Sequence, residues 1–301
     1  MRFSFWISPG QSWDEILSTA RHAEATGWDD IYVADHFMPD DEDTSGPMHE
    51  AWTLTGALSA AVPRVGIGVL VSGNTYRHPA VLAKMATTAD HVSGGRIILG
   101  LGAGWQENEH RAYGLEYSTL KGRLDRLEEA CEVITSLTSR PQTTFTGEHY
   151  QLVDAPLEPK PVQPALPLLI GGDGEKRTLR IAARFAQRWN TWGTPEHLRH
   201  KNDVLDRHCA DLGRDPSEIS RSAQGLLFLM DDEAAAARMR DRELDMPMLV
   251  GTPEQLVDAV AAYREAGVDE LIIPDFTLPG GAGKQEIMNR LMEEVIAPFR
   301  G

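Results

Sequence analysis

Residues 65–108 constrain the fold of this chain more than any other stretch. Two short apolar runs, residues 65–71 and 96–101, are bounded by turn residues, so both are predicted to be buried strands. Between them, apolar residues recur at helical spacing over 79–92, and Gly94 and Gly95 end the predicted helix. Buried parallel strands joined by a helix need helices on both faces of the sheet. The stretch therefore predicts an α/β fold built on a parallel sheet.

The same alternation of strand and helix runs along most of the 301 residues. About eight strands, each followed by a helix, predict a (β/α)8 TIM barrel that forms a single domain over residues 1–301. A doubly wound open sheet is the alternative, but it usually has fewer strands. The other strands are predicted at residues 3–7, 30–34, 166–170, 188–192, 219–230 and 270–274. The other helices are predicted at residues 13–26, 50–61, 107–113, 122–137, 175–185, 195–212, 253–266 and 285–297.

Two stretches do not fit this alternation. Residues 139–163 are rich in Thr and Pro and contain an apparent hairpin, in which 143–145 turns through Gly147 to 150–152. We interpret this stretch as an insertion that lies over one face of the barrel. Residues 231–248 are polar and rich in Ala and Arg, and no element is assigned to them.

Composition argues against several classes of function. The net charge of −16 argues against non-specific nucleic-acid binding, which needs a basic surface. No apolar run approaches the roughly 18 residues of a membrane helix, and the N-terminus shows no charged-then-apolar leader, so we expect a cytoplasmic protein without a membrane partner. Cys131 and Cys209 are too few for a disulfide framework, and no cluster has metal-ligand spacing. Because GAGWQE does not satisfy GxGxxG, a Rossmann site is not predicted either.

A glycine-rich turn lies between a predicted strand and the helix that follows it. Gly171, Gly172 and Gly174 would let the backbone approach an anion, and the N–H groups and positive dipole end of a helix start would complete a phosphate site. Lys176 or Arg177 could add charge. The alternative is a turn that needs glycine for its geometry alone. In a TIM barrel the phosphate interpretation is favoured, because phosphate sites recur after the later strands.

Asp35 and His36 come directly after the second predicted strand. A carboxylate beside an imidazole can fix its tautomer or raise its pKa, which suits a proton donor or a hydrogen-bond donor. A pair that only anchors its loop is the alternative. Since ligands bind at the carboxyl ends of barrel strands, we keep both residues as catalytic candidates.

Other strand ends should face the same space. Gly102, Ala103 and Gly104 would let a flat group lie against the backbone, because larger side chains would block it. Trp105 is either a wall or lid of that site or an aromatic side chain at the edge of the core. Asn108 is either a polar group at a helix start or an amide that contacts a ring. The remaining candidates at neighbouring strand ends are Leu70, Val71, Ser72, Asn74 and Trp192.

Four segments in order resemble the luciferase-like monooxygenase superfamily, and most closely its branch that uses the deazaflavin coenzyme F420. They are VADHF at 33–37, LVSGNTYRHPAVLAKMA at 70–86, GGRIILGLGAGWQENEH at 94–110 and IGGDGEKRTLRIAARFAQRWN at 170–190. The resemblance extends over nearly the whole chain, to about residue 274. It implies a TIM-like barrel with an insertion over the C-terminal rim, and a homodimer.

The resemblance also implies roles for individual residues. Asp35 and His36 would lie near the deazaflavin ring, with His36 as the proton donor. A non-proline cis peptide bond would join Leu70 and Val71 behind the ring, with Ser72 alongside. Contacts to the ring and the ribityl chain would be made by Gly102, Ala103, Gly104 and Asn108. The phosphate-binding turn would be formed by Gly171, Gly172, Gly174, Lys176 and Arg177. Beside these implied roles, the positions of Trp105, Asn74 and Trp192 at strand ends make them our candidates for the substrate pocket.

The implied activity is hydride transfer between coenzyme F420 and a small organic substrate. The alternatives are an FMN-dependent monooxygenase that uses NAD(P)H-derived reduced flavin and oxygen, and a non-catalytic cofactor-binding protein. One position departs from the sugar-phosphate dehydrogenases that the chain resembles. They carry a catalytic Glu directly after the second Gly of the fourth strand's turn, where this chain has Trp105. We therefore do not expect a sugar phosphate substrate, and Trp105 favours an apolar one.

Overall fold

The computed structural model describes residues 1–242, 244 and 246–300. Its main sheet is parallel throughout and closes on itself, because β3 pairs with β5 as well as with β2. The two-residue strand β4 (Ser72–Gly73) pairs with β5 beside the closed ring. The eight strands of the ring, in order around it, are β1 (Arg2–Ile7), β2 (Asp30–Val33), β3 (Gly66–Val69), β5 (Ile97–Gly102), β8 (Leu168–Gly171), β9 (Arg188–Trp192), β10 (Ser220–Gln224) and β13 (Glu270–Pro274).

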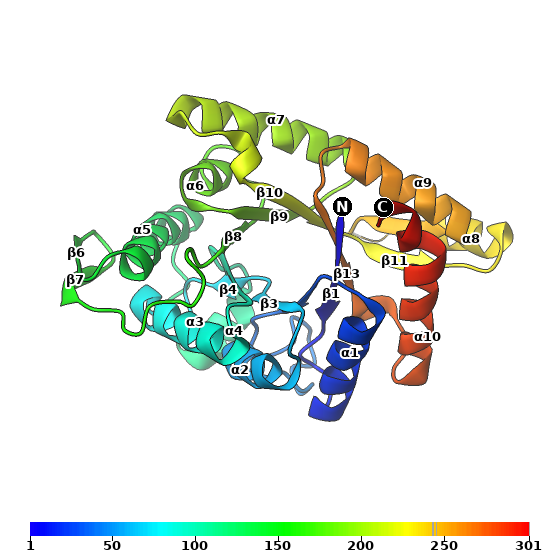
Figure 1. The fold of residues 1–301 in the computed structure, drawn as a ribbon, viewed down its shortest axis with the longest axis horizontal. Helices are drawn as coiled ribbons and strands as arrows, with labels where there is room; N and C mark the ends of the chain where they lie inside the picture. The colour runs from blue at the N-terminus through cyan, green and yellow to red at the C-terminus, as the bar shows by residue number, and fades with distance from the viewer. Residues whose placement is uncertain (243, 245, 301) are drawn as a thin grey trace.

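Helices surround this ring, as Figure 1 shows. The predicted (β/α)8 barrel is therefore confirmed. None of the helices in the described ranges has the length and apolar content of a membrane span. The helices are α1 (Trp13–Thr26), α2 (Ala51–Ala61), α3 (Pro79–Ser93), α4 (Glu107–Tyr113), α5 (Leu120–Ser139), α6 (Thr178–Phe185), α7 (Pro195–Leu212), α8 (Glu233–Arg240), α9 (Pro253–Glu265) and α10 (Ala282–Arg290), which continues as a π-helical turn over Leu291–Ile296.

The core has two parts because successive strand residues point to opposite faces. In β1, Phe3, Phe5 and Ile7 pack in a large cluster that fills the space between the strands and the helices. Trp6 points the other way and belongs to a smaller cluster. The other members of this smaller cluster, from strands around the ring, are Tyr32, Ala34, Leu70, Ile98, Leu169 and Ile272.

The structure corrects the prediction of one long strand over 219–230. The chain breaks at Gly225 into β10 and β11 (Leu226–Leu229). Whereas β10 stays in the barrel, β11 pairs with β12 (Met248–Gly251) in a separate two-stranded sheet. A side chain at Gly225 would collide with Leu249 of β12, so a glycine permits this departure. The stretch 231–248 therefore holds α8 and the start of β12, while positions 243 and 245 within it lie outside the described residues.

The predicted insertion forms the expected hairpin, β6 (Thr143–Thr146) and β7 (Gln151–Ala155), at the left of Figure 1. Glu129 of α5 accepts hydrogen bonds from three successive backbone N–H groups of its turn, those of residues 148–150. The hairpin reaches the rim through Tyr150, whose hydroxyl accepts a hydrogen bond from Asn74 (3.2 Å). The insertion thus meets the rim beside β4 rather than over its centre.

A network of charged side chains, which the sequence analysis missed, closes the barrel at the amino ends of its strands. Glu270 is fully buried and is bonded by Arg2 (2.7 Å), while Arg188 lies 2.7 Å from Asp30 and 3.6 Å from Glu270. Burial raises the pKa of Glu270, the Asp30 charge adds to this, and Arg2 and Arg188 oppose it. The two guanidinium groups therefore compensate two carboxylates that are largely hidden from water.

Replacing Arg188 by methionine should reduce the free energy of unfolding by about 3 kcal/mol, the low end for a broken buried ion pair, because the buried Asp30 and Glu270 then keep only Arg2 as a cationic partner among the described residues. Urea titration followed by circular dichroism measures this change. Arg199→Met is the matched control, since Arg199 and its partner Glu196 are both exposed and such pairs contribute about 0–1 kcal/mol. Equal losses in the two variants would contradict a role for the buried network.

Candidate active site

A cavity of about 810 Å³ lies at the carboxyl ends of the barrel strands. Most of the residues predicted for the site line it, from β2, β3, β5, β8 and β9 and the turns that follow them. They are Asp35, His36, Leu70, Val71, Ser72, Gly102, Ala103, Gly104, Trp105, Gly171, Gly172, Gly174 and Trp192. The cis peptide bond between Leu70 and Val71 that the resemblance implies is present.

The partner of His36 is Glu109, a residue that the sequence analysis did not select. The Nδ1 atom of His36 lies 2.9 Å from Oε1 of Glu109, which is fully buried in α4. The backbone N–H of Phe37 donates to Oε2 of Glu109 (2.7 Å), and the hydroxyl of Tyr76 donates to Oε1. The two residues are 73 positions apart, so no local pattern could have paired them.

The environment of Glu109 determines which atom of the Glu109–His36 pair carries the shared hydrogen. Burial alone would raise the pKa of the Glu109 carboxyl, but the hydrogen bonds from His36, the Phe37 amide and Tyr76 outweigh it and hold that pKa below its ordinary value. An ionised carboxylate can only accept hydrogen bonds, so Nδ1 of His36 must donate. The other ring nitrogen, Nε2, is therefore the one left to exchange a proton with a ligand.

Asp35 does not orient His36, which corrects the interpretation of these neighbours as a pair. Both oxygens of Asp35 instead accept from Arg77, at 2.6 and 2.9 Å, and Arg77 also pairs with Glu50. Burial raises the pKa of Asp35 above its ordinary value even though the Arg77 guanidinium acts to lower it. Asp35 thus ties the end of β2 to the segment after β4.

The glycines of β5 and β8 make room for a protein side chain, Val71. A Cβ atom at Gly102 would lie 2.7 Å from a methyl group of Val71, and one at Gly171 would lie 2.9 and 3.0 Å from its two methyl groups. A Cβ at Gly100 would collide with the backbone oxygen of Val69. These contacts, rather than a flat ligand alone, require glycine at those positions.

Four predicted residues do not line the cavity. Asn108 donates to the carbonyl of Pro39 (3.1 Å), and Asn74 donates to Tyr150. Lys176 is exposed on the outside, and Arg177 is paired with Asp125 (2.9 Å) and Glu128 (3.2 Å) of α5. Helix α6 also starts at Thr178, three residues later than predicted, so both cations precede it. That these four residues contact a ligand stays a prediction, and the contacts described here do not favour it.

The turn after β8 retains the features of an anion site without those cations. Gly172 has a φ of +111°, which glycine adopts easily, and it turns the chain toward α6. Across the described ranges, no side chain caps the start of α6 with a hydrogen bond. The N–H of Leu179 already donates to the carbonyl of Gly174 (3.0 Å), so the other N–H groups of the first turn and the positive end of the dipole remain suited to a phosphate.

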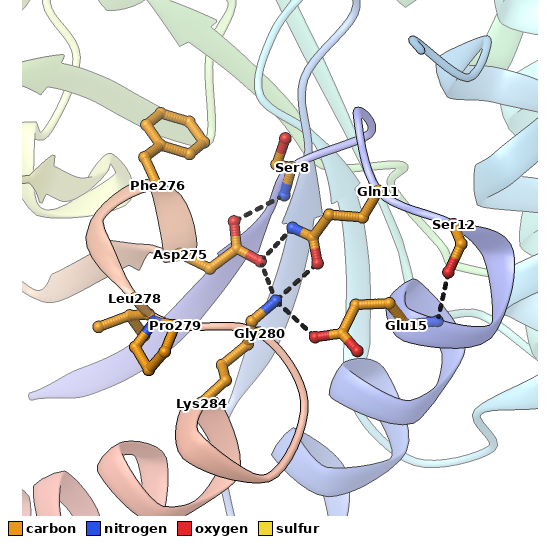
Figure 2. Close-up of a pocket in the computed structure, with 10 residues that line it drawn as sticks. All are labelled: Ser8, Gln11, Ser12, Glu15, Asp275, Phe276, Leu278, Pro279, Gly280 and Lys284. Carbon is orange, nitrogen blue, oxygen red and sulfur yellow. Dashed lines mark hydrogen bonds and ion pairs between the residues drawn. The ribbon is translucent and has the colours of Figure 1, made fainter. Parts of the chain in front are cut away.

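A second, smaller cavity of about 430 Å³ lies beside the main one. In Figure 2 the ammonium group of Lys284 faces Gln11 (2.6 Å), Asp275 (2.9 Å) and Glu15 (3.2 Å). The charge of Lys284 is fully matched, and the contacts join the loop after β1 to the loop after β13. Phe276 lines both cavities, so this cluster also positions a wall of the larger one.

In the part of the chain that the structure describes, no group of three or more His, Cys, Asp or Glu side chains could hold a metal ion. A closed parallel barrel with a cavity at the carboxyl ends of its strands is the architecture of TIM-barrel enzymes. Within that class, the chain belongs to the luciferase-like monooxygenase family, which it matches over residues 1–245. The predicted family is therefore confirmed.

Curated relatives include F420-dependent glucose-6-phosphate dehydrogenases. The protein of that name from Segniliparus rotundus is 35% identical over 308 residues, covering 88% of this chain and 88% of that protein. The one from Amycolatopsis mediterranei is 34% identical over 177 residues, covering 58% of this chain. The match spans only 50% of the length of that second relative.

Among solved structures, an F420-dependent secondary alcohol dehydrogenase in complex with an F420-acetone adduct superposes with a TM-score of 0.84. Its sequence is 20% identical, and the superposition covers 98% of each chain. At this level of identity the likeness establishes the shared barrel fold.

The contact between Val71 and β8 predicts a compensating pair of substitutions. Gly171→Ala should lower the free energy of unfolding by about 1–3 kcal/mol, because the new Cβ overpacks against Val71. In a Val71→Ala background the same substitution should cost less than about 1 kcal/mol, giving a positive coupling in a double-mutant cycle. Urea unfolding of the four proteins measures it.

The control is Gly56→Ala, within α2, where an added Cβ meets nothing within 4 Å. It should stabilise the protein by up to about 1 kcal/mol. Purely additive losses for Gly171→Ala and Val71→Ala would refute the proposed contact.

Replacing Glu109 by glutamine should lower stability by about 1.5–3 kcal/mol at pH 7, because hydrogen bonds to a charged group are lost. The pKa of Glu109 is lower in the folded than in the unfolded protein, so its contribution is fully present above the ordinary value of 4.5 and is lost as the pH falls through the folded value. The difference from wild type should therefore shrink below pH 4.5. Urea midpoints between pH 3.5 and 8 test this, with the exposed Glu107→Gln of the same helix as the control. A pH-independent difference would contradict an ionised Glu109.

Proposed function

We propose that this protein is an oxidoreductase that uses coenzyme F420 to transfer a hydride to or from a small organic molecule. One observation carries the proposal: a single cavity brings together His36, the Leu70–Val71 peptide and the glycine turn before α6. Its volume of about 810 Å³ suits a cofactor ring with a small substrate, since ligand pockets commonly measure about 300–1,000 Å³. The F420-dependent relatives support the choice of cofactor.

The residues that line the cavity fit this cofactor. The Leu70–Val71 segment would lie behind the ring, and Gly104 would lie beside it. The backbone N–H groups of Asp173 and Gly174 and the uncapped start of α6 would hold the phosphate, since the N–H of Gly172 already donates to the carbonyl of Asn190 (2.9 Å). When bound, coenzyme F420 supplies the hydride chemistry, and the protein supplies binding and orientation.

His36 is proposed to hold or supply the proton that accompanies the hydride. Glu109 fixes its ring through Nδ1, so Nε2 is the atom that exchanges the proton. Trp105 lies at the rim, 5.4 Å from the His36 ring and edge-on to it. Because Trp105 is 60% exposed, it is placed to cover His36 and exclude water when the cavity is filled.

The homodimer that the resemblance implies stays a prediction. Val81 and Val92 of α3 are about half exposed on the outer surface, at 54% and 50%, which is consistent with a covered face. Light scattering that gives twice the chain mass of 33.2 kDa would support the dimer.

The cofactor is tested by titration of the purified protein. Coenzyme F420 should bind with quenching of its fluorescence, at least tenfold more tightly than FMN, which is a difference of about 1.4 kcal/mol. Tight FMN binding together with NADH-driven oxygen uptake would instead favour an FMN-dependent monooxygenase. No binding of F420 would end the proposal.

The role of His36 has its own test. With a substrate that the wild type turns over, His36→Asn should lower kcat by about 100-fold or more, the usual contribution of a general acid or base. Affinity for F420 should change less than threefold, because the ring and phosphate contacts are proposed elsewhere. Unchanged turnover would exclude His36 as the proton donor.

A further inference from the structure

One wall of the main cavity is aromatic. Trp6 comes from the end of β1, Trp192 from the end of β9, and Phe276 from the loop after β13. The Trp6 ring lies 6.0 Å from Trp192 and 5.0 Å from Phe276, tilted at 45° and 57°. Since the ring of the cofactor is proposed to lie against β3 and β5, this wall faces the space left for the substrate.

Two polar atoms of this wall have no partner within the described residues. They are Nε1 of Trp6 and Oε1 of Gln224, whose side chain comes from the end of β10. Trp6 is 8% exposed and Gln224 is 4% exposed, so water satisfies these atoms poorly. Buried polar groups are normally hydrogen-bonded. Both atoms have almost no accessible surface, so a small shift of either side chain toward the cavity is needed before a hydroxyl or carbonyl group of a ligand can supply its partner in this otherwise apolar wall.

The charges around the cavity do not suit an anion in this space. Among the described lining residues, the acidic and basic side chains are Asp35, His36, Asp40, Arg123 and Asp173. The guanidinium of Arg123 has no carboxylate partner among the described residues, but it is held at the turn after β5, the side on which the cofactor is proposed to lie, because it donates to the carbonyls of residues 104 and 118, at 3.0 and 2.7 Å. It also stacks on Tyr117, 3.9 Å from the ring centre.

Two cations near the cavity but outside its lining are already paired with carboxylates. Lys284 is matched by Asp275, Glu15 and Gln11 (Figure 2), and Arg177 is tied to α5. The positions outside the described part are a Glu, an Asp and a Gly, none of which is basic. A phosphate dianion on this side would lose its hydration and gain no cation in return.

We infer that the substrate is an uncharged, mainly apolar molecule with one carbonyl or hydroxyl group, held between Trp6, Trp192 and Phe276, and that phosphorylated sugars are excluded. This inference rests on the proposed function and names the substrate class of the same cavity. It separates this chain from the glucose-6-phosphate dehydrogenases to which it is similar.

Calorimetric titration of the F420-loaded protein tests the inference without relying on turnover. The probes are 2-butanone, 2-hexanone and 2-octanone, with hexyl phosphate and glucose 6-phosphate as the anionic comparison. Affinity for the ketones should rise by about two- to fourfold per added methylene, as expected for burial of apolar surface. Both phosphates should bind at least tenfold more weakly than 2-octanone.

Two variants locate the binding site on the aromatic wall. Trp192→Ala should weaken 2-octanone binding by at least fivefold and leave F420 binding within threefold of wild type. Trp13→Ala is the control, since Trp13 lies on α1, outside the cavity lining. It should change neither affinity.

The inference is overturned if glucose 6-phosphate binds more tightly than 2-octanone, if ketone affinity does not depend on chain length, or if no ketone binds at millimolar concentration. In each of these outcomes F420 is bound, so the proposed function survives. If the protein does not bind F420, the fluorescence of F420 is not quenched when the two are mixed, before any ketone is added. That result would contradict the proposed function itself.

Discussion

The arrangement of the active-site rim depends on the packing of Val71 against bare backbone. The Val71 side chain lies against β5 and β8 at Gly102 and Gly171, where any Cβ would come within 3.0 Å of its methyl groups. Because protein interiors are close-packed, this contact fixes how near the segment after β3 lies to β5 and β8 at the carboxyl end of the barrel. The floor of the cavity is therefore set by a steric constraint within the chain, before any ligand binds.

Side-chain hydrogen bonds to two buried carboxylates fix the other side of the same rim. Glu109 of α4 holds His36, and Arg77 holds Asp35 at the end of β2, so each of these two carboxylates has a partner from a distant segment. Such buried pairs are strongly directional when every oxygen is satisfied. The ring of His36 consequently needs little reorganisation to present Nε2 to the cavity, which is what preorganised proton transfer requires.

The sequence predicted the barrel well because hydrophobic periodicity is a local property, and β1, β9, β13 and α7 lie within a residue of their predicted ranges. The prediction failed where contacts between residues that are distant in the sequence determine the structure. The break at Gly225 depends on Leu249, and the partner of His36 lies in α4 rather than next to it. The glycines at strand ends correctly indicated that another group lies close to the backbone, but the sequence could not identify that group as the Val71 side chain. The pairing of Arg177 with Asp125 and Glu128 likewise depends on where α5 lies.

The cavity thus has two walls with different origins. The wall from β3, β5 and β8 is held by steric and backbone constraints that leave few choices of residue, which explains why those segments carry the family resemblance. The wall from β1, β9, β10 and the loop after β13 is held by side-chain packing, as between Trp6 and Phe276, which tolerates substitution of one large apolar group by another. A barrel of this kind can keep its cofactor while its substrate changes.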